Sequence, residues 1–146
     1  MKLYLMRHGQ AESPQIDPLQ GLTSAGREAV KHIAQQCVSR GACFEQAFHS
    51  EKERARQTAE IMTGIIAPAV VPQLLSGLKP NDDPLLLLSE VNRWQQDTLI
   101  TSHLPLIPGL LALLCAGSQR PVFEPASVVC LSKAEGKWNI EWFMSA

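Results

Sequence analysis

The strongest constraint on the fold is an alternation along the chain between short apolar runs and longer stretches with apolar residues at helical spacing. This alternation favours parallel strands joined by crossover helices. The expected strands cover residues 2–6, 44–49, 70–74, 99–102, 127–131 and 138–143. The first expected helix follows a cap at Thr23 or Ser24, and the others begin at about Glu53, Pro84 and Leu110. The last two strands flank Gly136, which predicts an antiparallel hairpin at one edge.

The length of 146 residues fits one domain, so we expect a single α/β domain over residues 1–146. It should have three layers, with helices on both faces of a mainly parallel sheet. Hydrophobic residues make up 45% of the chain and charged residues 18%, which argues against disorder. The net charge of −1 disfavours a general nucleic-acid binder but leaves room for a local basic pocket.

The sequence shows no segment typical of membrane proteins or of secretion. Apolar runs such as residues 85–88 and 110–116 are far shorter than the roughly 18 residues needed to span a bilayer, and Arg7-His8 interrupts the first apolar run. The four cysteines have neither C-x-x-C nor zinc spacing. We therefore predict reduced thiols in a cytoplasmic protein, with no metal site.

Polar residues follow three of the predicted strands. Arg7-His8-Gly9 ends the first, His49-Ser50 ends the second and leads to Arg54, and Thr101-Ser102-His103 ends the fourth. Ligands of open α/β sheets bind beyond the carboxyl ends of the strands. If these strands are neighbours, two histidines and an arginine pair meet at one edge of the sheet.

The tripeptide Arg7-His8-Gly9 suits phosphoryl transfer, and a random order of the same residues would produce it only about 0.01 times. The planar fork of arginine donates paired hydrogen bonds to phosphate oxygens. A neutral imidazole can attack phosphorus and form a covalent phosphohistidine. Gly9 leaves space where the backbone would meet the phosphate. A second imidazole, protonated beside the anion, can stabilise the transferring group. None of these steps requires a metal or an organic cofactor.

These residues resemble the signature of the histidine phosphatase superfamily, which has the phosphoglycerate-mutase-like fold. The segments Leu22-Thr23-x-x-Gly26 and Ser50-x-x-x-Arg54-Ala55-x-Gln57-Thr58 are similar to two further elements of that family. Ser102-His103-Leu104-Pro105 and Leu78-x-Pro80-x-x-Asp83 resemble its small SixA-type phosphohistidine phosphatases. The matches occur in the order of the family and span nearly the whole chain.

The resemblance implies a role for each matching residue. His8 is expected to be the nucleophile, Arg7 and Arg54 to hold the phosphate, and His103 to complete the pocket as a charged donor. The implied substrate is a phosphohistidine on a partner protein, such as a phosphorelay or phosphotransferase component. One departure is Glu51, which stands where the family usually has proline.

Two other functions are consistent with the same residues. The first is a phosphatase of the same superfamily that acts on small phosphomonoesters, which needs a general acid. Asp82 and Asp83 are the available carboxyl groups, although Asp83 is better explained as a helix cap. A non-catalytic phosphate-binding module has Glu51 as its only support. His49 can line the rim of the pocket, but a half-buried structural role is favoured.

Several side chains also have purely structural interpretations. Arg54 lies in the first turn of its helix, where the helix dipole disfavours a cation, so either Glu51 and Glu53 neutralise it or it serves a function. Trp138 and Trp142 are expected to pack on one face of the last strand.

Overall fold

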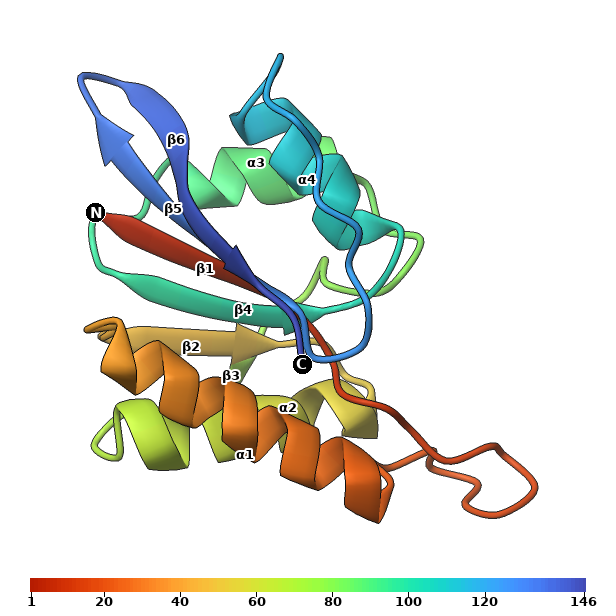
Figure 1. Cartoon of the computed structure of the whole chain (residues 1–146). Coiled ribbons are helices and arrows are strands. Elements are labelled where there is room, and N and C mark those ends of the chain that lie inside the picture. Colours follow the sequence, from red (N-terminus) through yellow and green to blue (C-terminus); the bar gives the residue numbers. More distant parts are fainter.

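Six strands form one sheet in the order β3-β2-β4-β1-β5-β6. The computed structural model describes all residues 1–146 (Figure 1). The elements in chain order are β1 (Lys2–Arg7), α1 (Ser24–Ser39), β2 (Gln46–His49), α2 (Glu53–Ile66), β3 (Gln73–Leu74), α3 (Pro84–Val91), β4 (Thr98–Ser102), α4 (Leu106–Leu114), β5 (Val128–Ala134) and β6 (Lys137–Met144).

The sheet lies between two layers of helices, as Figure 1 shows. Strands β1, β2, β3 and β4 run parallel to one another, whereas β5 runs antiparallel to β1 and forms the edge hairpin with β6. Alternate residues of β1 point to opposite faces: Leu3 and Leu5 pack with α3 and α4, and Tyr4 and Met6 pack with α1 and α2. The predicted α/β class, its three layers and its antiparallel edge are confirmed.

Two helices begin where the sequence predicts. The side chain of Thr23 accepts a hydrogen bond from the Gly26 N–H at the start of α1. The side chain of Asp83 accepts one from the Leu85 N–H, and Pro84 occupies the first position of α3. Helix α4 begins at Leu106, earlier than the predicted Leu110. Pro108 is tolerated there because the first turn of a helix leaves its N–H groups without intrahelical partners.

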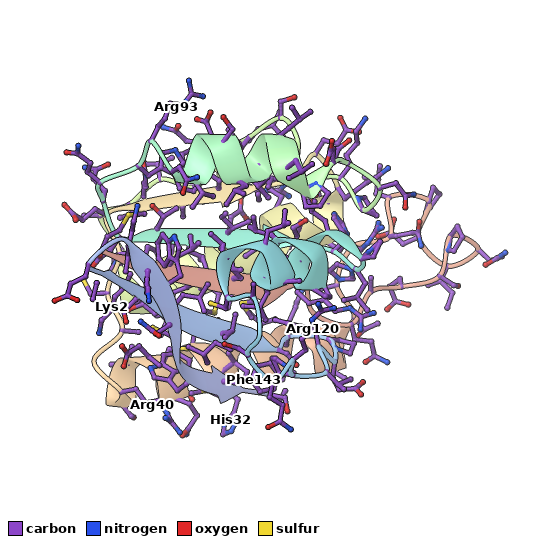
Figure 2. The ribbon with its side chains drawn as sticks, turned by 90° about the horizontal axis from the view of Figure 1, so that it is seen from above. Lys2, His32, Arg40, Arg93, Arg120 and Phe143 are labelled. Atoms are coloured by element: carbon purple, nitrogen blue, oxygen red, sulfur yellow. The ribbon has the colours of Figure 1, made fainter.

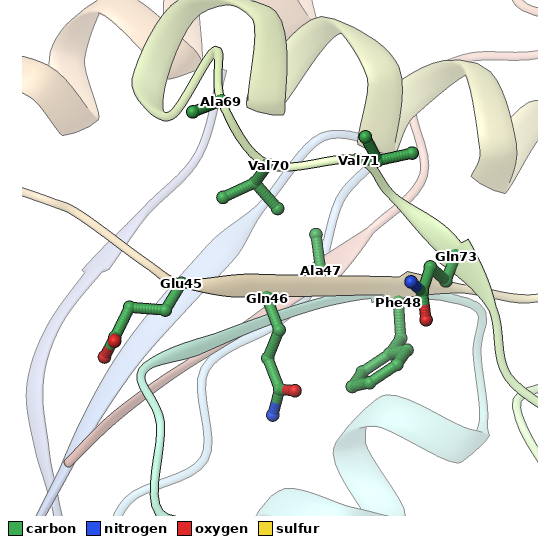
Figure 3. Close-up of a pocket in the computed structure, with 8 residues that line it drawn as sticks. All are labelled: Glu45, Gln46, Ala47, Phe48, Ala69, Val70, Val71 and Gln73. Carbon is green, nitrogen blue, oxygen red and sulfur yellow. The ribbon is translucent and has the colours of Figure 1, made fainter.

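The third strand is shorter than predicted. It pairs with β2 only through residues 73–74, since Pro72 has no N–H to donate to a ladder. Before Pro72 the chain leaves the edge of β2 and borders a cavity of about 230 Å³ (Figure 3). In that view Ala47 points to the opposite side of β2 from Gln46 and Phe48. This cavity lies at the amino end of β2 and contains no histidine or arginine.

The predicted placement of Trp138 and Trp142 on one face of β6 is wrong. Trp142 pairs with Cys130, but Ile140 pairs with Leu131, so Glu141 is an extra residue in the ladder. This bulge reverses the alternation of side chains. Trp138 therefore packs with the core on the α3 and α4 side, whereas the Trp142 ring lies 6.1 Å from the ring of Tyr4 on the other side.

All four cysteines are free thiols, three of them buried and one, Cys43, exposed. None of the helices is both long and apolar enough to cross a membrane.

Candidate active site

The order of the strands brings the three polar strand ends together. Strand β4 lies between β1 and β2, and its last residue, Ser102, pairs in register with Arg7. The N–H of His8 donates to the Ser102 carbonyl at 3.0 Å, which fixes the chain as it leaves β1. As a result, the imidazole rings of His8 and His103 lie with their centroids 5.0 Å apart.

His8 is held as a neutral imidazole in a defined tautomer. Its Nδ1 lies 2.7 Å from the Gly9 carbonyl oxygen. A carbonyl can only accept, so Nδ1 carries the proton and donates it, and Nε2 keeps its lone pair. Burial lowers the pKa of His8 to about 4, and the charges of Arg54 and Arg7 act in the same direction. At neutral pH, Nε2 is therefore available as a nucleophile.

His103 is also neutral in the pocket without an anion. Its side chain is 2% exposed, and burial, followed by the nearby His8 and Arg54, lowers its pKa to about 3. Its Nε2 shares a 2.6 Å hydrogen bond with the Ser50 hydroxyl, whereas its buried Nδ1 has no partner. The charged donor expected from the sequence thus requires an anion beside the ring, because opposite charge favours the protonated form.

The two arginines differ in how they are held. Arg7 donates from Nη1 to the Phe123 carbonyl at 2.9 Å, and its buried Nε has no partner. Arg54 forms no ion pair: Glu53 pairs with Arg56, and Glu51 lies 4.0 Å from Lys79. Burial lowers the pKa of the Arg54 guanidinium. The structural interpretation, that Glu51 and Glu53 neutralise Arg54, is therefore not supported, and this cation is free to bind an anion.

Gly9 also has a packing role that the sequence did not predict. A Cβ atom at this position would lie 2.8 Å from Cγ2 of Val30 and 3.2 Å from the Gly26 carbonyl oxygen. The missing side chain thus allows the loop after β1 to pack against α1. The Gly9 N–H donates to the buried Thr58 hydroxyl, which in turn donates to the Arg54 carbonyl at 2.8 Å. Thr58 therefore connects the backbone next to His8 with the backbone of Arg54.

The remaining predicted residues lie at the margin of the histidine pair. Asp82 borders a cavity of about 430 Å³ together with Arg54, but its Oδ2 accepts a hydrogen bond from the Lys79 N–H. Asp83 is exposed and caps α3. His49 is buried, and its Nδ1 lies 2.8 Å from the Ser50 carbonyl oxygen, which accepts a hydrogen bond from it. No group of three or more His, Cys, Asp or Glu side chains is arranged to hold a metal ion.

Sequence reasoning missed the polar residues that surround these groups. Ser50 and Thr58 belong to the quoted motif, so the motif contained a signal for them, although their contacts could not be predicted. Lys52 and Lys79 border the same cavity as Arg54 but lie on different segments, and only the fold brings them together.

The comparison with protein families agrees with this geometry. Residues 3–79 match the family model of the histidine phosphatase superfamily (branch 1). The chain therefore belongs to the histidine phosphatase superfamily, which confirms the family predicted from its sequence motifs.

Within this superfamily the chain is SixA-like. It is 28% identical to phosphohistidine phosphatase SixA of Escherichia coli K12, over 99% of this chain and 94% of that protein. A structure of the protein histidine phosphatase SixA complexed with tungstate superposes with a TM-score of 0.89, at 28% identity over 99% of this chain and 97% of the other. A phosphoserine phosphatase from Entamoeba histolytica, 18% identical, shares the fold with a TM-score of 0.73 over 99% and 97% of the two chains.

Anion binding is expected to depend on pH through the two imidazoles. A bound sulfate, which stays a dianion over this range, should raise the low pKa values of His8 and His103. For each imidazole, between its free and its bound pKa, the affinity rises by up to about tenfold for each unit that the pH falls. Calorimetric titration with sulfate at pH 7, 6 and 5 measures this slope.

The rise in sulfate affinity as the pH falls should be smaller in His103→Gln and unchanged in His32→Gln. His32 is a matched control because it is exposed on the outer side of α1 (Figure 2). A sulfate affinity that does not change with pH would show that the imidazoles do not contact the anion.

Proposed function

We propose that the protein is a metal-independent phosphatase that removes phosphate from phosphohistidine on a partner protein, through a phosphohistidine intermediate on His8. The observation that carries this proposal is the state of His8. Its Nδ1 is committed to the Gly9 carbonyl and its pKa is lowered to about 4, so Nε2 is an unprotonated nucleophile beside Arg7, Arg54 and His103. This combination provides both a nucleophile and cations for the transferring phosphoryl group.

The proposed reaction has two steps. In the first, Nε2 of His8 attacks phosphorus, an N–P bond forms to His8, and the N–P bond to the substrate imidazole breaks. The departing imidazole keeps the bonding electron pair and takes up a proton. In the second step, water attacks the phosphorus, the bond to His8 breaks, and inorganic phosphate is released.

In both steps Arg7, Arg54 and His103 bind the phosphoryl oxygens. The unpartnered Nε of Arg7 and Nδ1 of His103, together with the unpaired guanidinium of Arg54, are the donors available for this task. Because these donors are already in place, they stabilise charge in the transition state without reorganisation.

A protein-borne phosphohistidine is favoured over a sugar phosphate by the leaving group and by the relatives. An alkoxide needs a general acid, whereas an imidazole leaves more readily. Asp82 and Asp83 are both engaged by backbone N–H groups. The names of the related SixA proteins point to the same substrate class. We further propose a phosphorelay or phosphotransferase component as the partner, in the cytoplasm.

A comparison of substrates tests this proposal. The purified protein, assayed with and without EDTA, should hydrolyse a histidine-phosphorylated protein, and EDTA should not change the rate. Small sugar phosphates should be hydrolysed much more slowly. If sugar phosphates are instead the faster substrates, the small-molecule alternative is correct, and binding of phosphoproteins without turnover would favour a non-catalytic module.

The carboxylates provide a further prediction. Asp82→Asn and Asp83→Asn should each leave kcat for phosphohistidine within about threefold of the wild-type value, since a true general acid contributes about 10²-fold to 10⁴-fold. Steady-state kinetics of both variants, with thermal denaturation to check α3, provides the measurement. A loss of 10²-fold in Asp82→Asn alone would identify Asp82 as the general acid.

A further inference from the structure

Three neighbouring cavities lie in a row between Arg54 of the proposed active site and Leu86 on α3. The cavity beside Arg54 is bordered by Lys79, which also borders a second cavity of about 350 Å³. The second cavity shares residues 75–77 with a third, of about 320 Å³, that reaches Leu86 on α3. We call these three neighbouring cavities, which share lining residues, the β3–α3 groove. In Figure 1 the chain between β3 and α3, in yellow-green to light green, runs along this part of the molecule.

The far part of the β3–α3 groove is unusually apolar for an exposed surface. Leu74 is 62% exposed and Leu86 is 71% exposed, and both border the groove. Leu85, next to Leu86 on α3, is 59% exposed. A cluster of large exposed apolar side chains around a depression is typical of a protein-binding surface.

The near part of the groove is basic. Lys52, Arg54 and Lys79 border the first cavity, where Asp82 is the only carboxylate. The chain as a whole carries a net charge of −1, so this cluster is a local concentration of positive charge. Glu51 lies near Lys79, but at 4.0 Å and 57% exposure this ion pair is weak and an anionic ligand can replace it.

We propose that the β3–α3 groove binds an amphipathic helix of the phosphohistidine-bearing partner. The phosphohistidine enters beside Arg54, an acidic side chain next to it meets Lys79, and apolar side chains of the same helix cover Leu74 and Leu86. This inference rests on the proposed function and adds the kind of partner surface that the enzyme recognises.

A helix fits this surface better than an added strand. Strand β3 is the edge of the sheet but has only two residues, so an extended peptide would gain few backbone hydrogen bonds there. A helix instead presents apolar residues on one face at intervals of three and four, and it can carry a charge at one end of that face.

The inference can be tested with synthetic peptides phosphorylated on histidine. One peptide of about 20 residues, about 30 Å long as a helix, places leucines on one face and a glutamate beside the phosphohistidine. A second has the same composition in scrambled order. The wild-type enzyme should hydrolyse the first with a kcat/KM at least about tenfold higher, because apolar anchors dominate such interfaces.

Variants of the groove should remove this preference. Leu86→Asp and Leu74→Asp should each lower the ratio of kcat/KM for the amphipathic peptide to kcat/KM for the scrambled peptide toward one. Val38→Asp is the matched control and should keep the ratio, because Val38 is an exposed apolar residue at the C-terminal end of α1 and borders none of the three cavities. The inference would be overturned if Val38→Asp lost the preference for the amphipathic peptide, or if the wild type hydrolysed both peptides with the same kcat/KM.

Free phosphohistidine separates this inference from the proposed function. It is too small to reach Leu74 or Leu86. If the wild type hydrolyses free phosphohistidine but treats the two peptides alike, the proposed function stands and the docking surface is wrong. If it hydrolyses neither the free amino acid nor the peptides, the proposed function fails, and the inference fails with it.

The contribution of Lys79 can be isolated with a double-mutant cycle. Lys79→Gln in the enzyme and Glu→Gln beside the phosphohistidine in the peptide should each lower kcat/KM, and the two losses should not add. Additive losses would show that the acidic side chain does not meet Lys79.

Discussion

Replacing His8 with alanine should lower kcat for phosphohistidine by roughly 10⁴-fold or more, because it removes the nucleophile and with it the covalent step. The effect should be of this size because no neighbouring group can take the role. His103 is the only other imidazole in contact with His8, and in the proposed mechanism both of its ring nitrogens are engaged, Nε2 by Ser50 and Nδ1 by a phosphoryl oxygen. Steady-state and single-turnover kinetics of His8→Ala provide the measurement.

His32→Ala is the matched control for this experiment. His32 is exposed on α1, and surface substitutions usually change the free energy of unfolding by less than about 0.5 kcal/mol. The activity of His32→Ala should equal that of the wild type within about twofold. Full activity in a folded His8→Ala protein would be incompatible with the proposed mechanism.

Replacing Arg54 with alanine should lower kcat by about 10²-fold or more, as expected for a cation that stabilises charge in the transition state. Arg54 forms no ion pair within the protein, so its charge is available to the phosphoryl oxygens. Arg54→Lys should recover only part of the loss, since an ammonium group cannot donate the paired hydrogen bonds of a guanidinium. Kinetics of both variants on the same substrate measures the difference.

Arg56→Ala, two residues further along α2, distinguishes catalysis from the loss of a surface charge. Arg56 pairs with Glu53 and Glu60 on the exposed side of the helix, and such pairs contribute about 0.2–1 kcal/mol each to stability. Its kcat should remain close to the wild-type value. Equal losses in Arg54→Ala and Arg56→Ala would indicate a general electrostatic effect and contradict a direct contact between Arg54 and phosphate.

The sequence predicted the location of the site because parallel strands impose it. Once residues 2–6 and 99–102 were recognised as buried strands, His8 and His103 had to emerge at the same edge of the sheet. Their 5.0 Å separation follows from β1 and β4 being direct neighbours. The sequence pattern contains this information because the apolar runs mark the strands, and the helices between them make the strands parallel.

Other features depend on contacts that no local pattern contains. The bulge at Glu141, which separates Trp138 from Trp142, is set by the register of two strands. The packing of Gly9 against Val30 depends on how α1 returns to the sheet. The β3–α3 groove likewise arises from Lys79 and Leu86, whose positions relative to Arg54 are defined only by the complete fold.

The charge state of His103 also required the structure. The chemistry of phosphate suggested a protonated imidazole, but burial and the adjacent His8 lower its pKa to about 3 in the pocket without an anion. The protonated form thus depends on the substrate, so the pocket becomes most cationic when phosphate is bound.

The central claim, a covalent phosphate on His8, can be measured directly by mass spectrometry. The enzyme is mixed with a histidine-phosphorylated substrate, quenched at high pH within the turnover time, digested and analysed for phosphopeptides. We expect phosphate on the peptide that contains His8, labile to acid and stable to base, and absent from His8→Ala. Rapid turnover with no phosphorylated His8 at any quench time, or with phosphate on another residue, would contradict the mechanism.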